Sequence, residues 1–471
     1  MRDKIGYMFG DFGNDFTFIL QMAFFMLFYT NVVGIKPEHV GLLFLVARII
    51  DGFTDVGAGI LVDRLPSKRW DMKFKRWIRA MAIPVAVASA LMYSAFIADW
   101  ESYTARLVWM WATYFLWGSI TYTLINIPYG SISSVMSSDP DERAQLSVFR
   151  STGATLANLV IASVLPLIVY TKNEAGVAVL DGTRMQLSAI VCAVLAVVFY
   201  AICYWGIEQR VPSQVAPKGE GAGIGKMLAS VVTNKALLML ILAALSLLLG
   251  QMFLGGMVGY VFLSYFNNGA LQSPASLLAL VPALSLIVLA PIMNKKFGKA
   301  ETGGVAMLIG GVVLLGAYFM KIDQDQPWLW IAAYAVAMFC ISVFNYLVWA
   351  FITDVIDYQE IRTGARDDAT VYAIYSWSRK LGQAFAGGLT GVALGWIGFS
   401  ADDAKAGIAQ SAEAVDGIYM LANVIPGVFS LIVAFVLIFL YPLKKKVVDT
   451  NTEILVARRE GRVHPADPMK K

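Results

Sequence analysis

Long apolar segments alternate with short polar segments along almost the whole chain. Twelve of the apolar segments have about the 20 residues that an α-helix needs to cross a bilayer. The predicted spans are 5–30, 40–62, 77–98, 107–129, 145–170, 186–207, 236–265, 274–293, 302–320, 328–352, 369–396 and 417–442. The apolar runs are continuous, whereas a membrane β-barrel alternates apolar and polar residues in segments of about ten. The pattern therefore predicts an all-α integral membrane protein with 12 transmembrane helices.

Composition supports this prediction and narrows the chemistry. Apolar residues make up 58% of the chain and charged residues 15%, against about 45–50% and about 25% in ordinary soluble domains. The three cysteines lie inside apolar runs and the two histidines lie outside the predicted spans, which argues against a His/Cys metal site. The nucleotide-binding loop Gly-x-x-x-x-Gly-Lys-Ser/Thr is absent from the sequence, so transport driven directly by ATP is disfavoured. We expect no cofactor, no nucleic-acid partner and, without a soluble catalytic domain, no enzyme activity.

Polar segments divide the chain and orient it. The longest polar break, 208–235, is rich in proline and glycine and is typical of a flexible linker. It predicts two six-helix halves, 1–207 and 236–442, followed by a polar tail at 443–471. If both termini are cytoplasmic, 27 lysines and arginines fall on the cytoplasmic side and six on the other. This asymmetry favours cytoplasmic termini, linker and tail.

Short basic loops follow the second and the eighth predicted spans, at equivalent places in the two halves. The loops are 59–69 and 294–299, and they indicate a faint internal repeat of the kind found in transporters. The first loop resembles the signature of the major facilitator superfamily, Gly-x-x-x-Asp-Arg-x-Gly-x-Arg-Lys, with Pro66 in place of the second glycine. This resemblance implies that Asp63 and Arg64 form a conformational latch that does not touch substrate.

Eight ionisable residues fall inside the predicted spans. They are Asp11, Asp15, Arg48, Asp51, Asp55, Arg150, Arg379 and Lys380. On insertion scales each costs about 2.5–3.5 kcal/mol near the bilayer centre. Unpaired, the set would cost more than the typical stability of a fold, about 5–15 kcal/mol. The four acids and four bases must therefore pair or line a wet cavity. Structural salt bridges and functional sites are both open interpretations, and Arg48 in particular is placed to neutralise its acidic neighbours.

Asp51 and Asp55 lie four residues apart, so their carboxylates share one face of the second predicted span. Thr54 lies beside them, and the fourth predicted span offers another hydroxyl at Thr123. Carboxylate and hydroxyl oxygens suit Na⁺, whereas repulsion between two empty carboxylates favours proton binding. The residues predict a cation site and leave both ions open.

A second polar group is suited to sugar hydroxyls. Asp11 and Asp15 share a face of the first predicted span, with Asn14 beside Asp15. For Asp11, close to the start of its span, a structural role is an equal alternative. Asn126 precedes Pro128, where we expect a kink or break that lets backbone groups line a cavity. The aromatic candidates for covering the apolar face of a sugar are Tyr346, Trp349, Tyr375 and Trp377.

Several segments together resemble one family of the superfamily, the glycoside–pentoside–hexuronide:cation symporters. The segments are 7–15, 45–55, 117–130, 141–150, 354–366 and 379–383, and they cover nearly the whole chain. The resemblance implies a cation site at Asp51, Thr54, Asp55 and Thr123. It implies a substrate site at Asn14, Asp15, Asn126, Arg150 and Lys380, to which we add Trp377 as the aromatic candidate. It also extends the latch with Asp141 and Arg143.

The substrate positions depart from the melibiose-permease type of the family. That type carries a lysine, a carboxylate and a tryptophan where this chain has Asn14, Asn126 and Gly130. The segments 126–131 and 379–383 look more like the glucuronide and pentoside branch. A galactoside is therefore disfavoured. An acidic sugar is a hypothesis, because Arg150, Arg379 and Lys380 outnumber Asp15 if all of them face inward.

The resemblance and the residues together predict a symporter that couples a sugar or glycoside to Na⁺ or H⁺ by alternating access. We expect a functional monomer in the bacterial inner membrane, with the lipid bilayer, a small sugar and a monovalent cation as its partners. Two alternatives stay open: a proton-coupled exporter of small amphiphiles, and a non-transporting sugar sensor on the same scaffold. The density of polar groups in the spans argues against the exporter.

Overall fold

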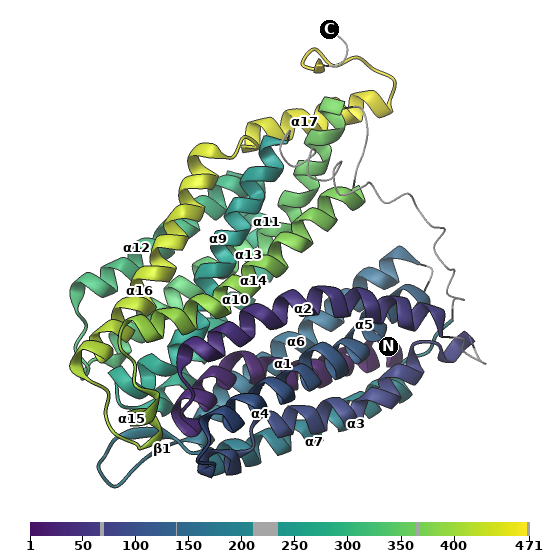
Figure 1. Ribbon diagram of the computed structural model, residues 1–471. Coiled ribbons are helices and arrows are strands. Elements are labelled where there is room, and N and C mark those ends of the chain that lie inside the picture. Colours follow the sequence, from purple (N-terminus) through teal and green to yellow (C-terminus); the bar gives the residue numbers. More distant parts are fainter. Residues whose placement is uncertain (66–69, 138, 211–233, 364–367, 469–471) are drawn as a thin grey trace. The chain divides into compact units, whose positions relative to one another are not determined.

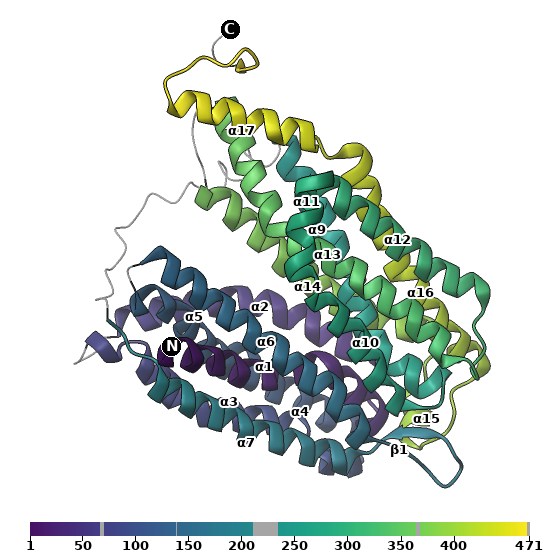
Figure 2. The same ribbon diagram turned by 180° about the vertical axis from the view of Figure 1, so that it is seen from behind.

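The structure is a computed structural model that describes residues 1–65, 70–137, 139–210, 234–363 and 368–468. Helices make up almost all of it (Figures 1 and 2). The α-helices are α1 (Arg2–Phe28), α2 (Pro37–Arg64), α3 (Lys75–Met92), α4 (Tyr103–Phe115), α5 (Thr123–Met136), α6 (Pro140–Val169), α7 (Gly182–Gly206), α9 (Lys235–Tyr260), α10 (Gln272–Leu284), α11 (Leu286–Phe297), α12 (Lys299–Met320), α13 (Pro327–Thr363), α14 (Asp368–Trp396), α15 (Ala401–Lys405), α16 (Ala412–Phe435) and α17 (Lys445–Arg459). Short π and 3₁₀ segments are η1 (Tyr29–Val33), η2 (Trp70–Met72), η3 (Ala95–Asp99), η4 (Leu116–Tyr122), η5 (Val261–Tyr265), η6 (Gly269–Leu271) and η7 (Val436–Leu440). One antiparallel hairpin pairs β1 (Tyr170–Lys172) with β2 (Ala178–Leu180), with Tyr170 opposite Leu180.

Each predicted span overlaps helical residues of the structure. In the part of the chain that is described, eight helical segments are long and apolar enough to cross a membrane. They are Arg2–Val33, Lys75–Asp99, Gln145–Val169, Gly182–Gly206, Lys235–Tyr265, Lys299–Met320, Pro327–Arg362 and Ala412–Leu440. Helix α2 is also long enough to cross a membrane, but Arg48, Asp51 and Asp55 lie along its middle. These charges make it less apolar than the eight segments above. The count of twelve spans stays a prediction.

Two helices depart from the predicted boundaries. Helix α13 continues to Thr363, past the predicted end at residue 352, into a polar segment that hydropathy does not detect. There Ile361 packs against Ile454 and Leu455 of α17. The eighth predicted span is two helices, α10 and α11, that meet at Ser285. The Ser285 N–H donates to the carbonyl oxygen of Pro282, three residues back, at 3.0 Å, and proline itself supplies no N–H. The regular pattern of α-helical backbone hydrogen bonds is therefore interrupted at Ser285.

Of the kink or break expected at Pro128, the break is wrong and the kink stays a prediction. Helix α5 runs through Pro128 to Met136, and the irregular hydrogen bonding lies upstream, in the π-helical segment η4. The predicted polar tail contains the 15-residue helix α17.

The chain forms two compact units. The first consists of Met1–Pro217, Gly255–Leu277 and Gly387–Ile418, and the second of Lys218–Leu254, Leu278–Ala386 and Tyr419–Lys471. The predicted division into two six-helix halves stays a prediction.

Helix α1 is the centre of the first unit and packs mainly on α6 and α7. Small residues allow these close contacts: a methyl group placed on Gly6 would lie 2.8 Å from the Cα of Gly206 in α7. The same helix carries the buried aromatic residues Phe24, Phe25 and Phe28. Its tight packing fixes the faces on which its polar residues lie.

The second unit is built around α12 and α13, which lie side by side. Trp330 in α13 is fully buried and donates from its indole nitrogen to Asn423 Oδ1 in α16 at 3.1 Å. Asn345 in α13 donates to Gln251 Oε1 in α9 at 3.0 Å. These bonds satisfy polar groups inside an otherwise apolar bundle.

Candidate functional site

Two carboxylates of α2 each meet a hydroxyl group from the neighbouring helical segment. Ser119 in η4 donates to Asp51 Oδ1 at 2.6 Å. One helical turn further along both segments, Thr123 donates to Asp55 Oδ1 at 3.2 Å. The structure thus brings together three of the four predicted cation-site residues and adds Ser119.

The π-helical segment explains why these hydroxyls face α2. Between Leu116 and Tyr122 the backbone adopts the wider π-helical hydrogen-bond pattern. The Thr123 hydroxyl also donates to the carbonyl oxygen of Gly118, five residues back, at 3.1 Å. Ser119 and Thr123 are four residues apart, as are Asp51 and Asp55, so the two pairs are in register. Single π turns of this kind often lie at functional sites, where they redirect side chains and free backbone carbonyls.

Arg48 lies one turn from Asp51 on the same helix. Its Nη1 atom is 3.7 Å from Asp51 Oδ2, and its guanidinium lies 5.7 Å from the centre of the Phe18 ring. Arg48 therefore balances part of the negative charge, as its spacing suggested. The fourth predicted ligand, Thr54, donates its hydroxyl to the backbone oxygen of Asp51 at 3.3 Å. Its hydroxyl oxygen keeps lone pairs, but this contact is to the backbone and not to either carboxylate.

A second polar group joins α1 to α5 and α7. The amide of Asn14 is 1% exposed and receives a bond from the Tyr200 hydroxyl at 2.8 Å. It donates a long bond of 3.4 Å to Asn126 Oδ1. The structure therefore brings the predicted residues Asn14 and Asn126 together and fixes the orientation of both amides.

Arg150 of α6 completes this group. Its Nε donates to Asp11 Oδ1 at 3.1 Å, and its guanidinium lies 5.3 Å from the centre of the Tyr129 ring. The Tyr129 hydroxyl donates to the carbonyl oxygen of Tyr7 at 2.6 Å, which fixes the ring. Asp15 is half-buried, and none of the described residues forms a hydrogen bond or an ion pair with it. Asp15 thus retains acceptor capacity inside the bundle.

Several predicted residues cannot be placed in either group. The side chains of Lys380, Trp377, Asp63, Arg64, Asp141 and Arg143 lie outside the described residues. Of the other aromatic candidates, Tyr346 is 45% exposed, and the side chains of Trp349 and Tyr375 also lie outside the described residues. Within the described part of the chain, no group of three or more His, Cys, Asp or Glu side chains could hold a metal ion.

Three members of the two groups are absent from the predicted sites. Asp11 is not among the predicted substrate-site residues, although it pairs with Arg150. Ser119 and Tyr200 are not among the predicted residues of either site. The spacing of Ser119, four residues before Thr123, was a signal that could have identified it. Nothing along the chain distinguishes Tyr200 from the other tyrosines of the spans.

Comparisons with known proteins place the chain among transporters. A family model described as "MFS/sugar transport protein" matches residues 6–445. The chain is 31% identical over 448 residues to the "Uncharacterized symporter YjmB" of Bacillus subtilis (strain 168), covering 94% of this chain and 92% of the relative. It is 30% identical to the "Glucuronide carrier protein homolog" of Escherichia coli (strain K12), covering 94% and 93%. It is 28% identical to a "Putative sulfoquinovose importer" of the same organism, covering 95% and 91%.

A solved structure shares the fold at low sequence identity. The crystal structure of the nucleoside transporter NupG aligns with a TM-score of 0.62 and 13% identity, covering 94% of this chain and all of the other. At this identity the likeness concerns the fold alone.

Proposed function

Since the chain belongs to the MFS/sugar transport protein family, and is therefore a membrane transporter and not an enzyme, we propose that it is a symporter that couples the uptake of an acidic sugar to Na⁺ or H⁺. The proposal includes twelve spans with cytoplasmic termini, a bacterial inner membrane and a functional monomer. The expected charge asymmetry of the loops supports the orientation.

One observation carries the coupling part of the proposal. Asp51 and Asp55 lie one turn apart, and each accepts a hydroxyl group from the same neighbouring segment, at 2.6 Å and 3.2 Å. Two carboxylates on one helix face repel each other, and a monovalent cation or a proton relieves this repulsion. The hydroxyl oxygens of Ser119 and Thr123 supply further hard ligands next to both carboxylates.

The second polar group suits the sugar. Asn14, Asn126 and Asp15 offer amide and carboxylate groups to hydroxyls. Arg150 offers a guanidinium whose side chain stays 39% exposed beside its ion pair with Asp11. The family resemblance assigns Lys380 to substrate binding as well, and Trp377 is the aromatic candidate. The names of two relatives, a glucuronide carrier homolog and a sulfoquinovose importer, support an acidic sugar, since both of those sugars carry a negative charge.

In the proposed mechanism, the cation binds first at Asp51 and Asp55 and raises the affinity for sugar. By thermodynamic linkage the sugar raises the affinity for the cation by the same factor. The loaded and the empty transporter exchange between outward-open and inward-open states, so neither substrate crosses efficiently alone.

The test is uptake of labelled sugars into proteoliposomes under an imposed Na⁺ or H⁺ gradient. The panel contains glucuronides, pentosides and galactosides, and the variants are Asp55→Asn and, as a matched control, Asp325→Asn at an exposed position after α12. We expect one ion to drive uphill uptake of a glucuronide, Asp55→Asn to abolish it and Asp325→Asn to retain it. If folded, inserted protein moves no panel member under either gradient, the exporter or sensor alternative replaces the symporter.

A further inference from the structure

Tyr200 of α7 places a buried hydroxyl against the polar side of α1. The Tyr200 side chain is 1% exposed, and its hydroxyl donates to Asn14 Oδ1 at 2.8 Å. Within the described part of the chain, this is the one hydrogen bond that the hydroxyl forms. A hydroxyl that accepted from the amide instead would leave its own buried proton without a partner, which is rare in proteins. Asn14 therefore turns its oxygen, and not its nitrogen, toward Tyr200.

A glycine of α1 makes room for the Tyr200 ring. A methyl group placed on Gly13 would lie 2.9 Å from two carbon atoms of this ring, much closer than the 3.5–4.0 Å at which carbon atoms pack. The ring thus lies directly against the backbone of α1, beside Asn14. The packing of α1 on α7 therefore fixes where the Tyr200 hydroxyl lies relative to the amide.

The orientation of Asn14 passes on to α5. An amide carries its oxygen and its NH2 group on opposite sides, so fixing one fixes the other. With its oxygen toward Tyr200, Asn14 donates from Nδ2 to Asn126 Oδ1 at 3.4 Å. Asn14 is itself 1% exposed. It therefore connects two neighbours inside the bundle and offers almost no surface to a ligand.

Asn126 ends this series of hydrogen bonds as a donor. Its oxygen accepts from Asn14, so its NH2 group lies on the other side of the amide. None of the described residues accepts a hydrogen bond from that nitrogen, and the Asn126 side chain is only half-buried. Asn126 thus presents two N–H groups, and not an oxygen, to a ligand that reaches it.

Arg150 lies along the same stretch of α5. Gly130 follows Asn126 by one helical turn, about 6 Å along the helix, and therefore shares its face. A methyl group placed on Gly130 would lie 3.7 Å from Arg150 Nη1. A guanidinium donates hydrogen bonds and cannot accept them. Asn126 and Arg150 therefore both offer donors in neighbouring turns, which suits a group that only accepts, such as a carboxylate.

We propose that Tyr200 is a positioning residue for the sugar site: through Asn14 it holds the Asn126 amide with its NH2 group toward the substrate. The site thereby selects a sugar whose oxygen at this place is an acceptor, and favours a carboxylate over a hydrogen atom. This inference rests on the proposed function and refines it, because Asn14 acts through Asn126 and Tyr200 touches no substrate.

The test compares two ligands that differ by the carboxylate alone, a methyl glucuronide and the corresponding methyl xyloside. Dissociation constants come from the shift of the melting temperature of full-length protein in detergent. Tyr200→Phe removes only the hydroxyl, so Asn14 Oδ1 loses its donor and the reverse orientation of both amides becomes accessible. We expect about fivefold weaker binding of the glucuronide, as is typical for one neutral hydrogen bond, and less than a twofold change for the xyloside.

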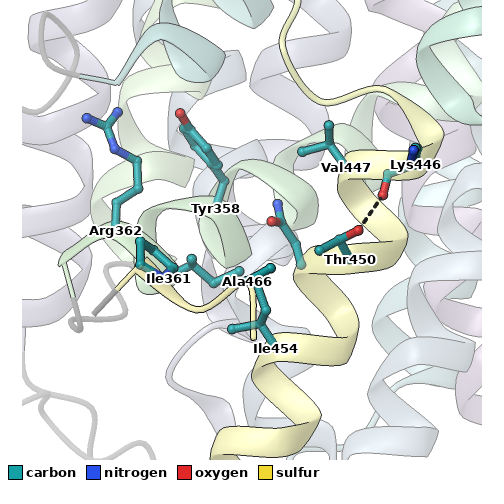
Figure 3. Close-up of a pocket in the computed structure, with 10 residues that line it drawn as sticks. Tyr358, Ile361, Arg362, Lys446, Val447, Thr450, Ile454 and Ala466 are labelled. Carbon is teal, nitrogen blue, oxygen red and sulfur yellow. Dashed lines mark hydrogen bonds between the residues drawn. The ribbon is translucent and has the colours of Figure 1, made fainter. Parts of the chain in front are cut away.

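Tyr358→Phe is the matched control. Tyr358 lines a cavity of about 380 Å³ between α13 and α17 of the second unit (Figure 3), whereas Tyr200 and both amides belong to the first. This variant loses the same hydroxyl group from the same residue type. It should bind both ligands as wild-type protein does.

A second background separates positioning from a merely structural role. Asn126→Asp replaces the amide by a carboxylate, whose two oxygens are equivalent, and we expect at least tenfold weaker glucuronide binding with the xyloside changed less than threefold. Since a symmetric group has no orientation to fix, adding Tyr200→Phe to Asn126→Asp should change the ratio of the two dissociation constants no further. A structural role would weaken binding of both ligands, and would do so in both backgrounds.

Two results would overturn the proposal while leaving sugar binding intact. One is an unchanged ratio of the two dissociation constants in Tyr200→Phe. The other is an equal further change of this ratio in the Asn126→Asp background.

If wild-type protein binds neither ligand, the sugar assignment fails, and the melting temperatures of unliganded variants decide the role of Tyr200 separately. Because Asn14 connects the two residues, the losses in Tyr200→Phe and Asn126→Leu should then be non-additive in the double variant. Additive losses would overturn the connection itself.

Discussion

Arg150 forms its ion pair with Asp11, four residues before Asp15 on the same helix, with 3.1 Å between Arg150 Nε and Asp11 Oδ1. The Asp11 side chain is 9% exposed and the Arg150 side chain 39% exposed. The acid is thus buried, whereas part of the Arg150 side chain remains accessible. If Arg150 binds the sugar as proposed, this arrangement predicts that Asp11 positions its guanidinium.

The first prediction concerns the charge of the sugar. Arg150→Gln should raise the KM for an acidic sugar by about tenfold or more, because a hydrogen bond to a charged group contributes about 1.5–3 kcal/mol. The KM for a neutral pentoside should change by less than threefold. Uptake of both sugars into proteoliposomes measures the difference, with Arg79→Gln as a control. Equal losses for acidic and neutral sugars would rule out a charge-specific contact.

Ser119 provides the second prediction. Ser119→Ala removes the hydroxyl that donates to Asp51 at 2.6 Å. With Na⁺ as the coupling ion, the apparent cation affinity should fall by about tenfold, because an oxygen ligand is lost; with H⁺ it should rise, because the hydroxyl stabilises the charged carboxylate. The KM for sugar at saturating cation should change little. The concentration of Na⁺ or H⁺ that gives half-maximal uptake measures this effect. Thr121→Val is a matched control, because the Thr121 hydroxyl donates to the backbone oxygens of Leu116 and Trp117. A similar loss in both variants would indicate damage to η4 instead of a role for Ser119.

Much of the fold follows from apolar length, because each membrane helix needs a continuous apolar run. The same signal fails where a helix leaves its apolar run. Helix α13 extends to Thr363 and α17 forms in a polar segment, since both depend on tertiary contacts such as that of Ile361 with Ile454 and not on hydropathy.

The site residues divide in the same way. The pair Asp51 and Asp55 is visible in the sequence because charge inside an apolar span is costly and thus informative. Ser119 and Tyr200 are not, because a hydroxyl in a span carries little cost and its importance depends on its partner across the bundle. The choice of Asp11 over Asp15 as the partner of Arg150 depends on how α1 is rotated against α6, which helical spacing alone leaves open.

The third prediction concerns an ion pair in the second unit. Lys299 Nζ lies 2.6 Å from Asp354 Oδ1, and the Asp354 side chain is 7% exposed. Lys299→Met leaves this carboxylate without its cation, and loss of one partner of a buried pair typically costs about 3–5 kcal/mol. We therefore expect a clear drop in melting temperature, and partial recovery in the double variant Lys299→Met with Asp354→Asn, where no charge is left unpaired. Additive losses in the double variant would show that the pair is not energetically coupled.

The fourth prediction concerns a close helix crossing in the first unit. Gly41 of α2 faces Gly391 of α14, and a methyl group placed on Gly391 would lie 2.7 Å from the Cα of Gly41 and also too close to the carbonyl oxygen of Pro37. Backbone atoms cannot move aside as a flexible side chain can, so Gly391→Ala has to separate the two helices. Overpacking of this kind costs about 1–3 kcal/mol, and the melting temperature in detergent should fall accordingly.

Gly316 of α12 is the matched control for this substitution, because no atom of the described residues lies within 4 Å of a methyl group placed there. Replacing a helical glycine by alanine at an open position stabilises the helix by up to about 1 kcal/mol. Gly316→Ala should therefore melt at the wild-type temperature or above it. Since the two variants make the same chemical change inside a helix, a lower melting temperature for Gly391→Ala alone measures the cost of the crossing. If both variants melt alike, the contact between α2 and α14 does not contribute to stability.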